Sequence, residues 1–291
     1  MLTYLLLGGL TSGALYALVA LGIVLVYKAT GTINFAHGEF LMISGFLAYS
    51  LYVFAGLPYL ISILGAVLLA FLLGAIAERI AFRPLMRANM VSLVLATVGV
   101  SFILKGSGRM LWGGRGDYLA FPPLLPPDPI IIGEIILVPQ QLVVLAGAMV
   151  VMVAFALFFR LTRIGKTMQA TADNPKAARL VGIRVEQVHM LAFGVGAAIA
   201  GAAAALMAPI TLLYPDIGFS LFIKGFAAAV LGGLNSMAGA LLGGFLIGVI
   251  ESLAGGYIAT SFLEVSAFIV IMVTLIFKPR GLLGLNAVRR A

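Results

Sequence analysis

Long apolar stretches, separated by short polar or glycine-rich connections, fill most of the chain. A helix needs roughly 20 apolar residues to cross a hydrocarbon core about 30 Å thick. Nine stretches approach or reach that length, and the seventh is the shortest. They cover about residues 3–27, 33–55, 59–81, 90–112, 139–159, 188–208, 219–233, 238–256 and 260–278. The pattern predicts an all-α, polytopic transmembrane helix bundle with about eight or nine spans, formed as one domain over residues 1–291.

The second stretch begins with an unusually polar sequence, GTINFAHGEF, which contains Asn34, His37 and Glu39 beside Gly31 and Gly38. An ionisable residue inside a bilayer costs about 2.5 to 3.5 kcal/mol and therefore usually faces a cavity or a partner. One interpretation is a broken or re-entrant helix whose polar groups line a solute pathway. The other is an interfacial helix start whose polar residues meet headgroups or cap the helix. The residues alone leave both open.

Further ionisable residues interrupt later apolar stretches, namely Lys224, Glu251 and, less deeply, Glu264. A lone charge is costly in lipid, so Glu251 is expected to pair with Lys224 or with His37. A structural ion pair inside the bundle is the simplest account of Glu251.

Asn235 lies in the sequence GGLNSMAG, between two apolar stretches. A tight cytoplasmic turn is the plain interpretation of this segment, and a contribution to a solute pathway is the alternative. The candidate pathway residues are therefore Asn34, His37, Glu39, Asn235 and Glu251.

Lysine and arginine concentrate in cytoplasmic loops of membrane proteins. Fourteen of the eighteen cations fit one orientation, with the N-terminus outside and the C-terminus in the cytoplasm, which nine crossings require. They are Lys28, Arg79, Arg83, Arg87, Arg160, Arg163, Lys166, Lys176, Arg179, Arg184, Lys278, Arg280, Arg289 and Arg290. The other four, Lys105, Arg109, Arg115 and Lys224, would lie in the membrane or on the outer side.

Two connections are long enough to have structure of their own. Residues 113–139 are too rich in proline and glycine for a helix and predict a partly extended external cover. Residues 160–189 form the longest polar stretch and are predicted to be cytoplasmic. Within it, Asp173-Asn174-Pro175 has a helix N-cap signature and Gly182 a stop signal, which predicts a helix of about two turns. This helix is either a docking element for a soluble partner or a solvated connector.

The 35 glycines include GxxxG spacings at Gly9/Gly13, Gly239/Gly243 and Gly244/Gly248. Small residues at this spacing let transmembrane helix backbones approach closely. The pairs therefore predict close helix packing.

Composition agrees with a membrane protein, because 63% of the 291 residues are hydrophobic, 10% are charged and the mean hydropathy is +1.17. A soluble domain could not bury that much apolar surface. The net charge of +8 arises from clusters in the connections, with no basic face for nucleic acid. The absence of cysteine excludes disulfides and thiolate metal sites.

Catalytic motifs are not found in the sequence. His37 and His189 make neither a metal site nor a catalytic dyad. Gly165-Lys166-Thr167 resembles the end of a phosphate-binding loop, but Arg160 stands where that motif needs a glycine. The chain is therefore not expected to be an enzyme or to bind a cofactor.

Three separated segments carry a family resemblance: INFAHGEFLMISGFLAY, TADNPKAARLVGI and GFAAAVLGGLNSMAGALLGGFLIGVIESL. They resemble the permeases of branched-chain amino acid ABC importers, most closely the LivH type. The resemblance extends from about residue 3 to Gly284 and includes the ending FKPRGLLG.

The resemblance implies a permease subunit in a bacterial inner membrane, which pairs with a LivM-type permease. Two cytoplasmic LivG/LivF-type subunits would use ATP and Mg²⁺, and an external solute-binding protein would deliver the solute. The resemblance also implies a coupling segment that sits in a groove of the ATPase. Its docking residues would be Asp173, Asn174, Ala177, Ala178, Gly182 and Ile183.

Branched-chain or related hydrophobic amino acids are the expected solutes, and urea, short amides or aromatic acids are alternatives within the same family. A different class, an ATP-independent carrier or channel, would explain the apolar stretches and the polar residues within them. It does not explain the capped cytoplasmic helix.

Overall fold

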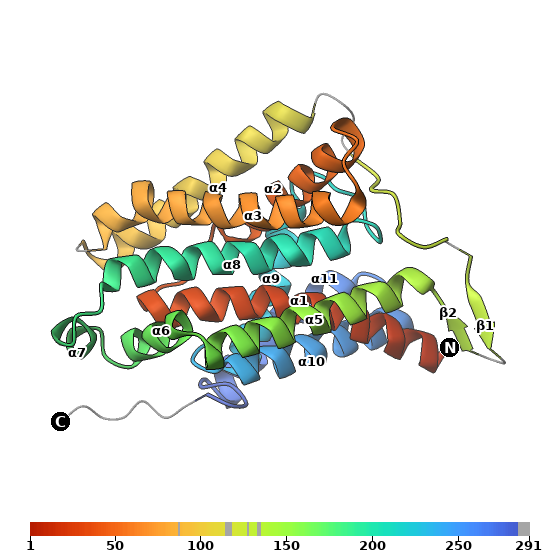
Figure 1. The fold of residues 1–291 in the computed structure, drawn as a ribbon. Coiled ribbons are helices and arrows are strands. Elements are labelled where there is room, and N and C mark those ends of the chain that lie inside the picture. Colours follow the sequence, from red (N-terminus) through yellow and green to blue (C-terminus); the bar gives the residue numbers. More distant parts are fainter. Residues whose placement is uncertain (87, 114–117, 127, 133–134, 285–291) are drawn as a thin grey trace.

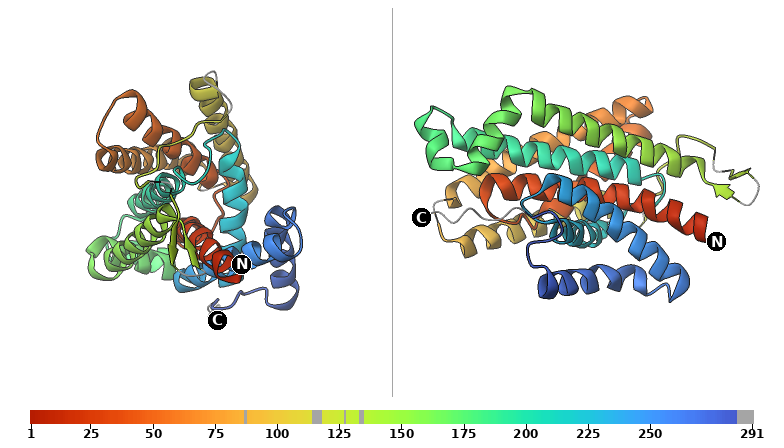
Figure 2. Two further views of the ribbon diagram at one scale, coloured as in Figure 1. Left: turned by 90° about the vertical axis from the view of Figure 1, so that its right-hand side faces the viewer. Right: turned by 90° about the horizontal axis from the view of Figure 1, so that it is seen from below.

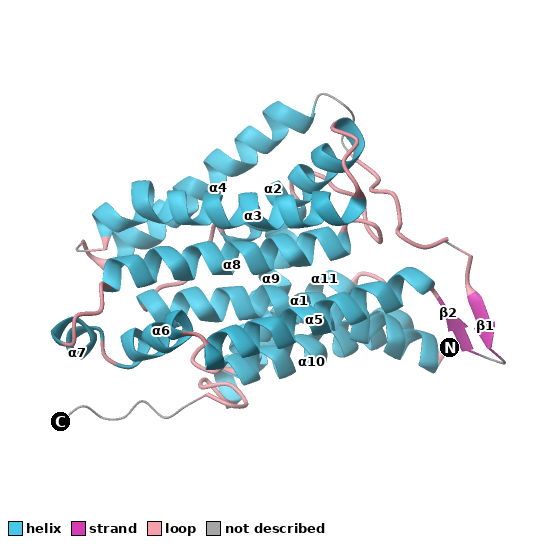
Figure 3. Cartoon of the chain, viewed as in Figure 1, coloured by secondary structure: helices cyan, strands magenta, loops and turns pink. Residues whose placement is uncertain are grey.

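The computed structural model describes residues 1–86, 88–113, 118–126, 128–132 and 135–284. Within these residues helices dominate, as the sequence predicts, and one short hairpin is the only sheet (Figure 3). The helices are α1 (Leu2–Thr30), α2 (His37–Tyr49), α3 (Tyr59–Ala77), α4 (Met90–Trp112), α5 (Pro139–Leu161), α6 (Arg163–Asp173), α7 (Pro175–Leu180), α8 (Val185–Met207), α9 (Ile217–Gly232), α10 (Met237–Tyr257) and α11 (Phe262–Phe277).

Each of the nine apolar stretches predicted from the sequence contains a helix. Of the described helices, six are long and apolar enough to cross a membrane: α1, α3 with its continuation to Leu85, α4, α5, α8 and α10. The helices α9 and α11 have 16 residues each, while α2 has 13 and continues through a π-helical turn at Ser50–Phe54.

The helix α1 runs through the interior of the bundle, and α11 lies at its edge (Figure 2). Almost every side chain of α1 from Gly13 to Val26 is buried, with α8, α9 and α10 packed around it. Where α1 crosses α10, a Cβ on Gly9 or Gly13 would meet the backbone of residues 244–249. The close packing predicted from the GxxxG spacings is therefore confirmed at this crossing.

The start of α2 lies inside the bundle. After α1 the chain turns at Gly31, whose φ of 75° favours glycine, and residues 31–36 lead back among the helices. A Cβ on Gly22 would lie 2.5 Å from Cε1 of His37, so α2 begins beside Gly22. Gly22 lies eight residues, or about 12 Å, before the last residue of α1. The polar start of α2 is therefore buried among the helices.

The connection at residues 113–139 is extended in its described part, as predicted, but it also pairs as strands. β1 (Ile130–Ile132) and β2 (Ile135–Leu137) form an antiparallel hairpin, with Ile130 opposite Leu137. Runs of β-branched isoleucine favour such pairing, and this signal stands beside the prolines and glycines of the connection. Arg115 of this connection lies outside the described residues.

The connection at residues 160–189 contains two helices instead of the single helix predicted. The helix α7 is the predicted one, and the Oδ1 atom of Asn174 caps it by accepting from the amides of Lys176 and Ala177, both at 3.1 Å. Gly182 follows with a φ of 85°. The predicted helix is therefore confirmed, and α6 is an additional helix that precedes it.

The missed helix α6 buries Gly165, Met168 and Thr171 on one face, and Thr162 caps its start by accepting from the Gly165 amide at 3.0 Å. The three-residue spacing of these positions was its signal in the sequence. Both helices lie at the end of the bundle opposite the N-terminus (Figure 1).

Candidate functional site

The polar start of α2 meets the start of α9. A Cβ on Gly38 would collide with the carbonyl of Gly218, and a Cβ on Gly218 would collide with the carbonyl of Gly38. The two helices can approach this closely because neither residue has a side chain. The starts of α2 and α9 therefore lie next to each other.

Glu39 lies at this contact and is buried. Its Oε1 atom accepts a hydrogen bond of 3.4 Å from Ser101 of α4. Its Oε2 atom has no hydrogen-bond partner among the described residues and lies next to Gly218. A buried carboxylate with a free oxygen is costly, and such a group is characteristic of functional sites.

Three charged residues lie on the same side of α2 as Glu39. Lys105 and Arg109 of α4 both pair with Asp216, which directly precedes α9, and the Arg109 Nη2 to Asp216 Oδ2 distance is 2.9 Å. Hydrogen bonds from Lys105 first, and then from Arg109, hold the pKa of Asp216 below its usual range. Lys105 and Arg109, two of the four cations that did not fit the cytoplasmic loops, therefore link α4 to the residue that precedes α9.

His37 and Asn34 do not share the environment of Glu39. His37 is buried between α1 and α8, against Gly22, and its Nε2 atom has no hydrogen-bond partner within the described part of the chain. The Oδ1 atom of Asn34 accepts from the Ala36 amide at 3.1 Å and shapes the turn into α2. Asn34 therefore has a structural contact, whereas His37 and Glu39 each have an unused polar atom.

The expected ion pair of Glu251 is confirmed, with Lys224 as the partner. Lys224 Nζ of α9 donates to Glu251 Oε1 of α10 at 2.5 Å and to the hydroxyl of Tyr16 on α1 at 3.3 Å. His37 does not take part in the described contacts of Glu251. The pair joins three helices of the bundle interior.

Asn235 is separated from the other candidate pathway residues, because it lies in the turn between α9 and α10. It lines a cavity of about 170 Å³ together with Tyr27 and Arg280. Ser236 caps α10 by accepting from the amide of Gly239 at 3.0 Å. The plain interpretation, a tight turn, describes this segment.

The six predicted docking residues lie around α7 but do not all face outward. Asp173, Asn174, Ala177 and Gly182 are exposed, whereas Ala178 is buried and Ile183 packs on the core. The sequence analysis missed Leu180 and Val181, which are 89% and 77% exposed on this helix and just after it. Two large apolar side chains protruding at one place usually mark an interaction site.

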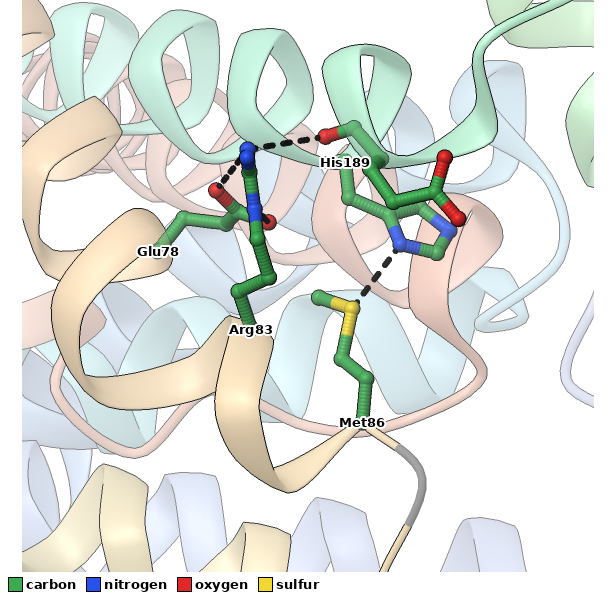
Figure 4. Close-up of polar contacts among 5 residues, drawn as sticks. Glu78, Arg83, Met86 and His189 are labelled. Atoms are coloured by element: carbon green, nitrogen blue, oxygen red, sulfur yellow. Dashed lines mark hydrogen bonds and ion pairs between the residues drawn. The ribbon is translucent and has the colours of Figure 1, made fainter.

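Polar contacts join the Arg83 turn after α3 to the start of α8 (Figure 4), and an ion pair of Arg179 links α7 to the same segment. Arg179 of α7 donates to Glu186 Oε1 at 3.0 Å, and Arg83 donates to the carbonyl of Glu186 at 3.2 Å. Arg83 also forms two bonds, of 3.2 and 2.8 Å, with Glu78, whose side chain is fully buried after α3.

A second contact supports this network. Nδ1 of His189 on α8 lies 3.0 Å from the sulfur of Met86, which follows the Arg83–Leu85 turn. From the sequence, Arg83 and Arg179 were interpreted only as topology signals and His189 only as an isolated histidine. Together they connect α7, the start of α8 and the end of α3.

The comparison with protein families is decisive. The model for the permease component of branched-chain amino acid transport systems matches residues 5–277. The chain is a member of this permease family. The resemblance noted from the sequence is thereby confirmed.

Curated relatives of this permease family cover almost the whole chain. The chain is 34% identical to the high-affinity branched-chain amino acid transport system permease protein BraD of Pseudomonas aeruginosa, over 96% of this chain and 94% of BraD. It is 32% identical to the LivH permease protein of Escherichia coli strain K12, over 95% of this chain and 93% of LivH. A probable branched-chain amino acid transport permease protein LivH of Methanocaldococcus jannaschii is 30% identical, over 96% of this chain and 91% of that protein.

A solved structure shares the fold. PsaBC from Streptococcus pneumoniae, in complex with Fab, superposes with a TM-score of 0.56 at 14% identity, covering 94% of this chain and 91% of that chain. At this identity the likeness concerns the fold alone.

Proposed function

We propose that this permease is the transmembrane subunit of an ATP-driven importer for branched-chain or closely related hydrophobic amino acids in a bacterial inner membrane. The observation that carries the proposal is the family match over residues 5–277, together with relatives named for branched-chain amino acid transport. Permeases for urea, short amides or aromatic acids are the alternatives within the family.

The partners follow from the proposed importer. A second permease of the LivM type, two LivG/LivF-type subunits that use ATP and Mg²⁺, and an external solute-binding protein would complete it. This chain would bind no cofactor itself.

The proposed topology has nine crossings, in which α2, α9 and α11 count as spans, with the N-terminus outside. The cations at the α6 and α7 end of the bundle support this orientation under the positive-inside rule. The shorter helices would complete their crossings through adjoining non-helical segments, which are tolerated in a bilayer where protein surrounds them.

For the solute pathway we retain His37, Glu39 and Glu251 as the main candidates, because each has an unused polar atom in the bundle interior. Asn34 would act by shaping the turn before α2. Asn235 would contribute at the opposite end of the pathway.

For coupling, we propose that α7 docks on the ATPase through Leu180 and Val181, supported by the predicted residues around them. Movement of α7 would reach α8 and α3 through Arg179, Glu186 and Arg83. Such a network of ion pairs is a physical connection through which a rigid-body movement can be transmitted.

The test is ATPase activity of the reconstituted assembly with leucine-loaded binding protein. A Leu180→Ser, Val181→Ser variant is compared with Leu161→Ser, which changes a 73% exposed leucine at the end of α5. We expect the double variant to assemble but to lose stimulation, and the control to retain it. Unchanged stimulation in the double variant would show that α7 is not the coupling element.

An ATP-independent carrier is the competing class. It predicts uptake of leucine by proteoliposomes that contain the permease subunits without the ATPases. The proposed importer predicts no uptake in that preparation.

A further inference from the structure

A polar cavity of about 280 Å³ lies between α1, α5 and α10. Its lining includes Gly8, Thr11 and Ser12 from the first half of α1. The helix α1 begins at the end of the bundle opposite α7 (Figure 1). The polar side chains that line it are Thr11, Ser12, Gln141, Glu251 and Ser252. So many oxygen atoms around a cavity within an apolar bundle indicate a site for a polar ligand.

The two carboxylate oxygens of Glu251 have different surroundings. Oε1 accepts from Lys224 at 2.5 Å, whereas Oε2 is buried without a hydrogen-bond partner among the described residues. Glu251 is 5% exposed and lines the cavity. An unpaired buried acceptor costs about 1 to 3 kcal/mol, and more when it is charged, so a donor in the cavity would be bound favourably.

We propose that this cavity binds the ammonium group of an amino-acid solute, with Glu251 as its anionic acceptor. An ammonium group has three donors and no acceptor, which matches a carboxylate surrounded by hydroxyl and amide oxygens. Charge-assisted bonds of this kind are about twice as strong as neutral ones. The inference rests on the proposed function for the class of solute.

Charge balance favours a zwitterion over a metal cation. Lys224 already neutralises Glu251, so a bare sodium ion would leave a net positive charge in the membrane interior. An amino acid brings its own carboxylate, and the site remains neutral. The two apolar residues Ile210 and Leu263 also line the cavity and could contact an aliphatic side chain.

The position of the cavity fits delivery from outside. In the proposed orientation, the end of the bundle that carries the N-terminus faces the external binding protein.

The experiment measures binding of radiolabelled L-leucine to the assembled transporter in nanodiscs without binding protein. Two analogues compete: 3-methylbutylamine keeps the ammonium group, and 4-methylpentanoate keeps the carboxylate. We expect the amine to displace leucine, but more weakly than unlabelled leucine does because it lacks the compensating carboxylate, and we expect the acid to leave leucine bound. Glu251→Gln should weaken binding about 10- to 100-fold, the range for loss of a charged hydrogen bond.

Two further variants separate binding from folding. Glu251→Gln leaves Lys224 unpaired, so Gln141→Leu, which does not affect the ion pair, provides an independent test and should weaken binding at least threefold. Glu264→Gln changes an exposed glutamate at the same end of the bundle and should bind leucine normally.

Equal displacement by both analogues, or unchanged affinity in both cavity variants, would overturn the proposal. Displacement of leucine by sodium chloride but not by choline chloride would assign the cavity to a metal cation and also overturn the proposal. ATPase stimulation by leucine-loaded binding protein without Glu251-dependent binding would refute this site while the importer function stands. Glu251-dependent amine binding without that stimulation would refute the importer function and leave the site.

Discussion

Gly38 of α2 and Gly218 of α9 contact each other through their backbones, so that a Cβ on either residue would collide with the carbonyl of the other. The two helices begin at this contact, inside the bundle. Glu39 follows directly, and its free oxygen lies against Gly218. Because Gly38 and Gly218 have no side chains, the polar start of α2 can pack directly against the start of α9.

Alanine at Gly218 should separate α2 from α9. Overpacking of a tight contact costs about 1 to 3 kcal/mol, which exceeds the gain of about 0.5 to 1 kcal/mol from replacing glycine in a helix. We expect a lower thermal stability of Gly218→Ala in detergent and a reduced transport rate. Gly106→Ala on α4 is the matched control, because a Cβ there meets nothing within 4 Å, and it should be as stable as the wild type or more so.

The buried carboxylate of Glu78 depends on Arg83. Arg83→Met should destabilise the protein by about 3 kcal/mol, because it leaves the charge of Glu78 buried without its partner. Adding Glu78→Gln should restore much of the loss, since no unpaired charge then remains. The measurement is unfolding by a denaturing detergent.

Arg179→Met serves as the control for this cycle. It removes an exposed ion pair with Glu186 and should cost at most about 1 kcal/mol. If Arg179→Met lowered the stability as much as Arg83→Met, the loss of stability would come from the network of ion pairs and not from the unpaired charge of Glu78.

The ion pairs of Asp216 should become pH-dependent only in acid. Lys105 and Arg109 lower the pKa of Asp216 in the folded protein, so their stabilising effect is complete above the unfolded pKa of about 3.9. The effect is lost as the pH falls through the lower, folded pKa. The difference in thermal stability between wild type and Asp216→Asn should therefore stay constant from pH 8 to pH 5 and shrink below about pH 4. A difference that already shrinks between pH 8 and pH 6 would contradict the pairing.

The parts of this structure that a bilayer dictates were predictable from the sequence. Apolar stretches must form helices because lipid offers no partners for the backbone. The pairing of Lys224 with Glu251 was predictable for a related reason, since few partners exist for a charge in a membrane. The helix cap at Asn174 depends only on neighbouring residues, so the sequence predicted it correctly.

The contacts that were missed join residues far apart in the chain. Arg83 and Glu186 are separated by 103 positions, and from the sequence Arg83 was interpreted only as a topology signal. The contact of Gly38 with Gly218 likewise depends on how α2 and α9 cross, which no local pattern encodes. The sequence could not predict that Oε2 of Glu251 is buried without a hydrogen-bond partner, because this depends on the packing of α1, α5 and α10 around the cavity.

The crossing of the membrane by α9 can be tested with single cysteines, because the natural chain has none. Leu180, after α6, and Ile258, after α10, are 89% and 67% exposed. Between them lie α8, α9 and α10. If all three cross, Leu180→Cys should react with an impermeant maleimide only in inverted vesicles stripped of the ATPase subunits, and Ile258→Cys only in intact cells. If the 16-residue α9, about 24 Å long, does not cross, the two cysteines would react from the same side. Reaction from opposite sides in the reverse order would keep the three crossings and invert the proposed orientation.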